Sequence, residues 1–214
     1  MTHANCRIYL VVEAEPAAIE PLTAAFGAAD VACCLILPAA GAAAAEAAAA
    51  GAIVEAVQEA GVAALLADDA GLARALRADG VHLSSTRNLL AAYTAARQAV
   101  GPQAIVGADV GVSRHDAMSL AEAGADYIAF GAPHRLSDRA RARERRDDLV
   151  TWWGEIFEIP CVVLDADGAQ EAERLARAGA DFVAVRLATG ASAASAHDLV
   201  AAIGAAIGAR EHCG

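Results

Sequence analysis

The tetrapeptide Ala-Gly-Ala-Asp occurs at residues 123–126 and again at residues 178–181, and Arg77-Ala78-Asp79-Gly80 is a looser version of it. Each copy stands between a helical pattern and a short apolar run that is typical of a buried strand. The glycine suits the left-handed position that ends a helix, and the acidic residue marks the entry to the strand. We therefore interpret the repeat as a structural junction of an α/β fold, and not as a ligand site.

The same alternation of strand and helix extends over the whole chain. Brief apolar runs predict strands at residues 8–12, 31–37, 63–66, 80–83, 104–108, 127–130, 161–164 and 182–185. Helical patterns follow them at residues 16–26, 43–60, 70–76, 87–100, 113–123, 145–157, 169–178 and 194–207. Eight such pairs close a (β/α)8 barrel, the TIM barrel. A doubly wound sheet is the alternative, but the first strand lacks the glycine-rich turn that such sheets usually have. We predict a single barrel domain over residues 1–214.

The composition narrows the function classes. The 214 residues suffice for one barrel with a sizeable core, built mainly from small aliphatic residues because aromatics make up only 4%. The net charge of -11 predicts repulsion of nucleic acid and anionic lipid. The sequence has no signal-peptide pattern and no apolar stretch long enough to span a membrane. The five cysteines lack metal-type spacing. We expect a cytoplasmic protein whose partner is a small molecule, with a homodimer left open.

Four segments carry a resemblance to a known family. Residues 65–69 (LLADD) resemble the strand end "IINDD" of thiamine phosphate synthases, and residues 78–83 (ADGVHL) resemble their strand "ADGVHLGQ". Residues 123–131 are similar to "GADYIGFGP", and residues 159–181 to the stretch "IPVVAIGGI…GAD". The resemblance covers residues 9 to about 185. The related thiazole tautomerases share this framework, so the framework does not separate the two activities.

The resemblance implies a reaction with definite physical needs. In the family, a pyrimidine pyrophosphate loses pyrophosphate, and the nitrogen of a thiazole phosphate traps the resulting cation. Mg2+ held by carboxylates must neutralise the leaving group. Lysine and arginine must stabilise its developing charge. A glycine-rich backbone near the last two strands must hold the thiazole phosphate.

This sequence departs from the family at most of those positions. The family's Gln-x-Arg-x-Lys corresponds to residues 34–38 (CLILP), which carry no charge, and its phosphate-binding Gly-Gly corresponds to Asp165-Ala166. Arg139 keeps the charge of the family's loop lysine. By position at strand ends, the candidate residues are His134, Arg139 and Asp109 for catalysis, Ser84, Ser85, Arg87, Gly131, Asp165 and Arg186 for substrate binding, and Asp68 for Mg2+.

Several of these candidates have a second interpretation. Asp68 and Asp69 suit an N-cap for the following helix as well as a metal site. His82 lies in a buried strand and is interpreted as a structural histidine that points into the barrel. Thiazole tautomerases use a histidine in the loop that holds His134, which also suits an exposed loop. The arginine-rich residues 135–146 suit a lid over an anionic substrate, a disordered loop or the start of a helix.

Three functions stay open on the sequence alone. The first is an enzyme of thiamine metabolism, either a transferase that releases pyrophosphate or a tautomerase. The second is a barrel enzyme with other chemistry on another small molecule, and the third is a non-catalytic ligand-binding relative. The fold does not choose between them, because barrels host many chemistries. Asp165 and Asp167 predict weak phosphate binding, since they add negative charge where the family offers backbone N–H groups. We expect Arg186 to pair with one of the two.

Overall fold

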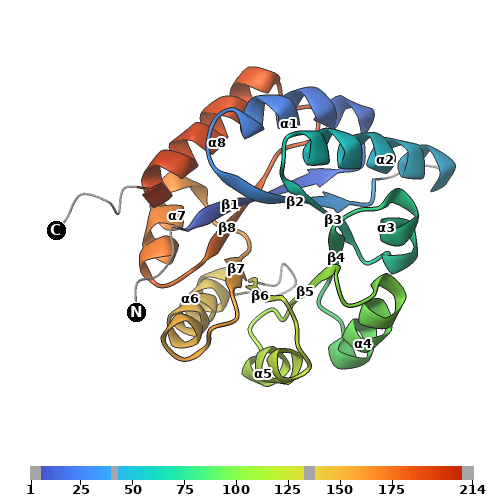
Figure 1. The fold of residues 1–214 in the computed structure, drawn as a ribbon. Helices are drawn as coiled ribbons and strands as arrows, with labels where there is room; N and C mark the ends of the chain where they lie inside the picture. The colour runs from blue at the N-terminus through green and yellow to red at the C-terminus, as the bar shows by residue number, and fades with distance from the viewer. Residues whose placement is uncertain (1–5, 40–42, 133–137, 209–214) are drawn as a thin grey trace.

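The computed structural model describes residues 6–39, 43–132 and 138–208. It is a closed barrel of eight parallel strands in the order β1 to β8, with the helices outside the ring (Figure 1). The strands are β1 (Arg7–Glu13), β2 (Val31–Leu37), β3 (Ala63–Ala67), β4 (Gly80–Leu83), β5 (Ile105–Asp109), β6 (Tyr127–Phe130), β7 (Cys161–Val163) and β8 (Phe182–Arg186). The predicted (β/α)8 barrel is confirmed.

A helix follows each strand. The helices are α1 (Ile19–Phe26, preceded by the 3-10 turn Pro16–Ala18), α2 (Ala43–Glu59), α3 (Ala70–Leu76), α4 (Leu89–Val100), α5 (Arg114–Glu122), α6 (Arg139–Ile156), α7 (Gly168–Arg177) and α8 (Ala193–Gly208). The predicted bounds agree within two residues except at α1, where the predicted first three residues form the 3-10 turn, and at α6, which begins six residues before the predicted residue 145. The Asp138 side chain accepts a hydrogen bond from the Arg141 N–H and caps this helix. Residues 139–146 are therefore helix and not a disordered loop, residues 135–137 lie outside the described residues, and the lid over an anionic substrate stays a prediction.

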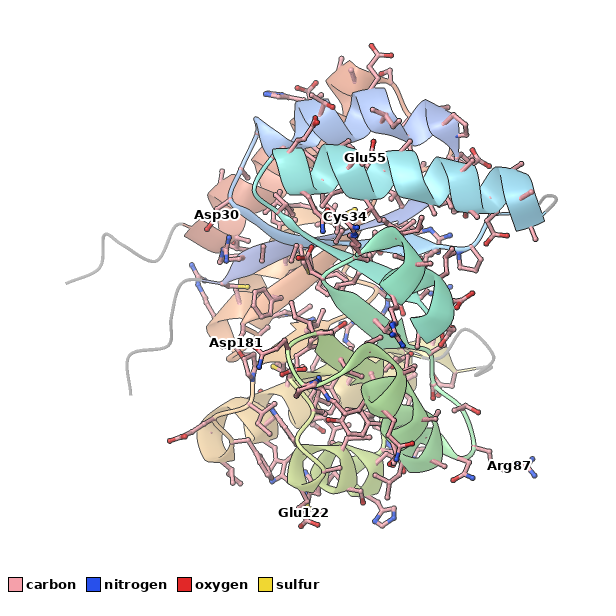
Figure 2. All side chains as sticks on the ribbon, turned by 45° about the vertical axis from the view of Figure 1, so that its right-hand side comes forward. Asp30, Cys34, Glu55, Arg87, Glu122 and Asp181 are labelled. Carbon is pink, nitrogen blue, oxygen red and sulfur yellow. The ribbon has the colours of Figure 1, made fainter. Side chains whose placement is uncertain are left out.

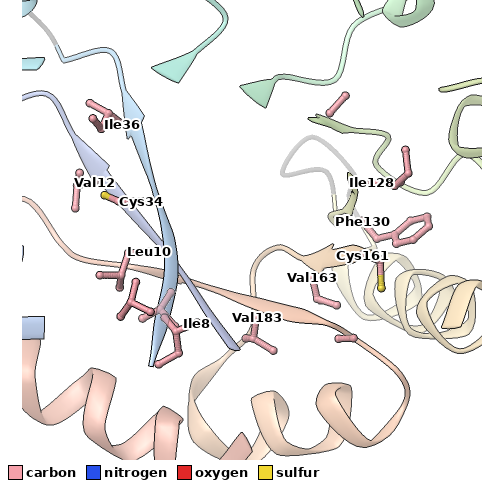
Figure 3. Packing of buried hydrophobic residues seen from close by; sticks show 14 of the residues in the cluster. Ile8, Leu10, Val12, Cys34, Ile36, Ile128, Phe130, Cys161, Val163 and Val183 are labelled. Atoms are coloured by element: carbon pink, nitrogen blue, oxygen red, sulfur yellow. The ribbon is translucent and has the colours of Figure 1, made fainter. Parts of the chain in front are cut away.

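Strand alternation divides the core into two apolar layers. On β1 and β2, side chains such as Leu10, Cys34 and Ile36 gather on the side away from the barrel axis, where the helices pack (Figure 3). Tyr9 and Leu35, one position along, belong to a separate cluster inside the barrel. Of two neighbouring residues in a strand, one side chain therefore points into the barrel and the other points toward the helices.

The acidic residue of the repeated junction has a defined partner. The carboxylates of Asp79, Asp126 and Asp181 accept hydrogen bonds from the backbone N–H at the start of the preceding strand, at 2.7–2.8 Å. Asp30, before β2, binds the side chain of Arg7 in β1 instead. Asp30 and Asp181 are labelled at the same end of the barrel in Figure 2. The interpretation of the repeat as structural is supported, since these carboxylates join strands in pairs at the amino ends of the strands.

The glycines of the repeat take two different roles. Gly124 and Gly179 have φ of 88° and 112°, as predicted for residues that end a helix. In the looser copy, Arg77 takes the left-handed position with φ of 56°. The prediction was wrong for Gly80, because it begins β4 and a Cβ there would lie 2.0 Å from the Ile105 carbonyl oxygen. Gly80 is needed for close approach of two strands.

Candidate functional site

A cavity of about 580 Å3 opens at the carboxyl ends of the strands. In a barrel this end carries the loops that bind ligands. One side of the cavity, from β1 and β2, is apolar, with Val11, Leu35 and Leu37. The side from β5 to β8 and the first turns of α6 is polar. Its lining residues include Asp109, Gly131, Arg139, Arg143, Asp165, Asp167, Gly168 and Arg186.

The structure brings six of the predicted site residues to this cavity. They are Asp109 in β5, Arg186 in β8, Arg139 in α6, and Ser84, Gly131 and Asp165, which follow β4, β6 and β7. Ser85 and Arg87 do not line it, and Arg87 projects outward at the edge of the molecule (Figure 2). His134 lies outside the described residues. The roles given to these residues stay predictions.

Asp109 is a half-buried carboxyl group that lines the cavity. It ends β5, where one Oδ1 accepts a hydrogen bond of 2.7 Å from the Gly111 N–H. Burial raises the pKa of Asp109 to about 6, the Gly111 N–H opposes this rise, and the Asp165 carboxylate adds to it. A carboxyl group with such a pKa exchanges protons near neutral pH, as a general acid or base must.

The carboxyl end of β2 corrects the alignment with the family. Residues 34–38 were matched to Gln-x-Arg-x-Lys, which puts Cys34 and Ile36 at the positions of Gln and Arg. The structure buries Cys34 and Ile36 against the helices, while Leu35 and Leu37 line the cavity. Because functional cations must face the mouth, Leu35 and Leu37 are the informative positions. Both are apolar, so the conclusion that β2 supplies no charge to the cavity is unchanged.

Asp68 and Asp69 are engaged in hydrogen bonds of the fold. Asp69 Oδ1 accepts from the Leu72 N–H at 2.8 Å and caps α3. Asp68 has a left-handed φ of 57°, and its Oδ1 accepts from the Ser84 N–H at 2.7 Å. Among the described residues, no group of three or more His, Cys, Asp or Glu is arranged to hold a metal ion. Because one or two carboxylates and the substrate phosphates usually hold Mg2+, the role of Asp68 as a Mg2+ ligand stays a prediction.

The ion pairs at the mouth differ from those expected. Arg186 was expected to pair with Asp165 or Asp167, but its Nη2 lies 2.6 Å from Glu13 Oε1. Thr189 also donates to this carboxylate, at 2.9 Å. Asp167 is instead 3.5 Å from Nη1 of Arg143. The expectation for Arg186 was wrong because Glu13, at the end of the neighbouring β1, is closer along the sheet edge.

The charges that line the cavity are balanced. Three arginines from α6 and β8 face three aspartates from β5 and the loop after β7. Asp165 has a φ of 60°, so this loop keeps a left-handed conformation that suits the family's glycine. A phosphate entering the site would meet carboxylates as well as arginines.

The sequence reasoning missed Arg143 and Arg146. Arg146 is fully buried: its Nη1 donates to the carbonyl oxygens of Leu164 and Asp165, and its Nη2 contacts Asp147 and Glu171 at 2.8 and 2.7 Å. It thereby fixes the loop after β7, which forms one wall of the cavity. Asp138, an N-cap residue, is the signal that could have placed Arg143 in the helix, whereas no local signal marks the burial of Arg146.

Aromatic hydroxyls and a histidine lie below the mouth. His82 is 4% exposed and lines the cavity. Its Nδ1 is 2.7 Å from the Tyr127 hydroxyl, which is 2.9 Å from the Tyr9 hydroxyl. Burial lowers the pKa of His82 to about 4, against a smaller opposing effect of Asp68, so the imidazole is neutral at pH 7. The prediction that His82 points into the barrel is confirmed.

The amino-acid sequence matches a known protein family and individual proteins of that family. Residues 8–189 match the family model described as thiamine monophosphate synthase. The chain belongs to this family. The thiamine-phosphate synthase of Rhodospirillum centenum is 38% identical over 184 residues, which cover 85% of this chain and 87% of that protein. The thiamine-phosphate synthase of Erythrobacter litoralis is 40% identical over 126 residues, 58% of each chain.

Solved structures show the same fold. Thiamine phosphate pyrophosphorylase from Pyrococcus furiosus superposes with a TM-score of 0.74 at 19% identity, over 97% of this chain and 98% of that one. A tryptophan synthase from Mycobacterium tuberculosis superposes with a TM-score of 0.68 at 16% identity, over 95% and 94% of the two chains. Within the described residues, this thiamine monophosphate synthase family member has no helix of the length and apolarity needed to cross a bilayer.

Proposed function

We propose that this family member is a small-molecule enzyme of thiamine metabolism that transfers protons at Asp109, as a tautomerase does, and that it does not displace pyrophosphate. The observation that carries the proposal is the half-buried Asp109 carboxyl group at the cavity, whose pKa of about 6 suits a group that gains and loses a proton at neutral pH. We expect the protein to work in the cytoplasm.

The apolar side of the cavity supports the same choice. A leaving pyrophosphate needs cations or a metal ion close to its developing charge. Leu35 and Leu37 present neither, and of the arginines on the opposite side Arg143 lies next to Asp167 and Arg186 next to Glu13. The proposed proton transfer takes place at the Asp109 carboxyl group, and no step of it is assigned to Asp68.

Proton transfer is tested by isotope exchange. Purified protein is incubated in D2O with a thiazole carboxylate phosphate, and NMR follows both isomerisation and loss of carbon-bound protons. We expect exchange whose rate depends on pH with an apparent pKa near 6, and we expect Asp109→Asn to lower the rate by about 100-fold or more. Asp116→Asn on α5 is the matched control, because Asp116 does not line the cavity. Absence of exchange in the wild type refutes the proposal.

The coupling of pyrimidine pyrophosphate to thiazole phosphate is the second candidate. The 38% identity to the Rhodospirillum centenum thiamine-phosphate synthase, over 87% of that protein, favours it. So does Arg139, which lines the cavity and has no ion pair with a described residue. Robust Mg2+-dependent formation of thiamine phosphate, abolished by Asp68→Ala, would select this function. Ligand binding without either reaction would select a non-catalytic role.

A further inference from the structure

The backbone of Asp165 is held rigidly at the wall of the cavity. This residue follows β7, lines the cavity and has a φ of 60°, a conformation that is unfavourable for a residue with a Cβ. The buried Arg146 donates to the carbonyl oxygens of Leu164 and Asp165, at 3.0 and 3.2 Å. Glu171 accepts from Arg146 and from the Asp167 N–H. The chain is thus fixed on both sides of Asp165, and its side chain leaves from a defined point.

Asp109 and Asp165 belong to strand ends that flank β6. Asp109 ends β5, Asp165 follows β7, and Gly131 follows the strand between them; all three residues line the cavity. A Cβ on Gly131 would lie 3.4 Å from Asp109 Oδ1 and 3.3 Å from the side chain of Leu164, the residue before Asp165. Because residue 131 is a glycine, no side chain separates the Asp109 carboxyl group from the loop that carries Asp165.

The two carboxyl groups interact electrostatically. Burial is the largest cause of the raised pKa of Asp109, and the negative charge of Asp165 adds to it. The other ionisable side chains that line the cavity, within the described residues, are His82, Arg139, Arg143, Asp167 and Arg186. Of the charged groups at the cavity, Asp165 is the one that raises the pKa of Asp109. Carboxyl groups that interact in this way titrate as a pair, and over an intermediate pH range they hold one proton between them.

We infer that Asp165 is a second acid–base residue of the cavity, and that it shares one proton with Asp109 across the gap beside Gly131. The inference rests on the proposed function in taking proton transfer as the reaction. A proton shift within a substrate needs one group that accepts a proton from one atom and another group that donates a proton to a second atom. Two carboxyl groups that hold a single proton supply both.

Protons and electrons balance in such a step. The ionised carboxyl group of the pair removes a proton from a carbon atom of the substrate, and the electron pair of the broken C–H bond forms a double bond to the neighbouring atom. The electron pair of the former double bond takes the proton of the other carboxyl group, two positions from the first carbon. The pair still holds one proton, now on the opposite carboxyl group, and exchange with water restores the starting state.

The pair is tested first without any ligand. Carbon-13 NMR of protein labelled at the aspartate carboxyl groups follows ionisation, and the signals are assigned by their loss in Asp109→Asn and Asp165→Asn. Asparagine adopts the left-handed conformation readily, so Asp165→Asn should fold. We expect the pKa of Asp109, about 6 in the wild type, to fall in Asp165→Asn and to stay unchanged in the control Asp116→Asn. An Asp109 pKa that is equal in Asp165→Asn and the wild type overturns the inference.

Use of the pair in the reaction is tested by a double-mutant cycle on the isotope exchange in D2O. Asp165→Asn should lower the rate by about 100-fold, as Asp109→Asn does, and the double variant should also lose about 100-fold, because residues that act as a unit are not additive. The wild-type rate should fall at high pH, where the shared proton is lost, and at low pH, where a second proton binds. A rate of Asp165→Asn within about threefold of the wild type, or a loss of about 10,000-fold in the double variant, overturns the inference.

The two proposals fail in different ways. Absence of exchange in the wild type refutes the proposed function. The NMR titration then still decides the pair, because the pKa of Asp109 responds to Asp165→Asn if the two carboxyl groups share a proton, and does not respond if they titrate independently.

Discussion

Substitution of Arg146 is the sharpest test of how the cavity wall is held. The Arg146 side chain has no exposed surface, and it contacts two backbone carbonyls and two carboxylates. Arg146→Met keeps the aliphatic stem but removes the guanidinium. Asp147 and Glu171, whose side chains are 20% and 13% exposed, then lose a buried partner. Breaking a buried pair by removing one member costs about 3–5 kcal/mol.

The cost at this site falls at the lower end of that range. Arg174 also contacts both carboxylates, at 2.8 and 3.3 Å, and stays in place to compensate them in part. We therefore expect Arg146→Met to lower the free energy of unfolding by about 3 kcal/mol. With a urea dependence of about 3 kcal/mol per molar, the unfolding midpoint falls by about 1 M. The assay is equilibrium urea unfolding followed by circular dichroism.

The matched control is the exposed pair of Arg177 and Glu173 on α7, where the arginine side chain is 65% exposed. Arg177→Met should cost under about 1 kcal/mol, because water already solvates both charges. Equal midpoints for the two variants would refute the reasoning, and would mean that Arg146 gains no more from its four partners than a surface arginine gains from one.

Three further predictions concern the site. The pKa of Asp109 is about 6 in the folded state and about 3.9 in the unfolded state, so the free energy of unfolding of the wild type falls as the pH rises from about 4 to 6. Thermal melts of Asp109→Asn should lack this fall, and above pH 6 the variant should be more stable than the wild type by up to about 3 kcal/mol. The double variant Asp165→Gly with Asp167→Gly should bind inorganic phosphate roughly tenfold more tightly by calorimetry, because two carboxylates are removed and Arg143 loses its partner; unchanged affinity in a folded variant would show that the acidic pair does not limit phosphate binding. Gly107→Ala should destabilise the fold by about 2 kcal/mol, because its Cβ would lie 2.2 Å from the Tyr127 ring; a melting temperature equal to that of the wild type would contradict the packing described.

The sequence predicted the barrel well because each strand and helix has a local signal. Short apolar runs such as residues 127–130 are bounded by polar junctions, and the helices between them have their own periodicity. The start of α6 was missed because arginines on both faces hide the apolar stripe, although the capping Asp138 was visible.

The site was less predictable because it depends on which face of a strand each residue takes. A shift of one residue separates Leu35, in the cavity, from Cys34, behind the sheet. Ion-pair partners depend on distances between strand ends, so nothing in the sequence near residue 186 indicates that Glu13 is the partner of Arg186. The burial of Arg146 likewise depends on the tertiary contacts of α6 and α7, because charge alone predicts an exposed residue.

The aspartates before the even-numbered strands have a consequence for how the chain could be divided. Each joins an even strand to the odd strand before it, so β3 with β4 and β5 with β6 are tied as pairs at the base of the barrel. A break in the connection from β4 to β5 severs none of these ties, whereas a break between β3 and β4 separates Asp79 from Ala64. Split halves cut after β4 should therefore reassemble when expressed together, and a circular permutant opened there should fold, while both rearrangements should fail when the new ends lie within a pair.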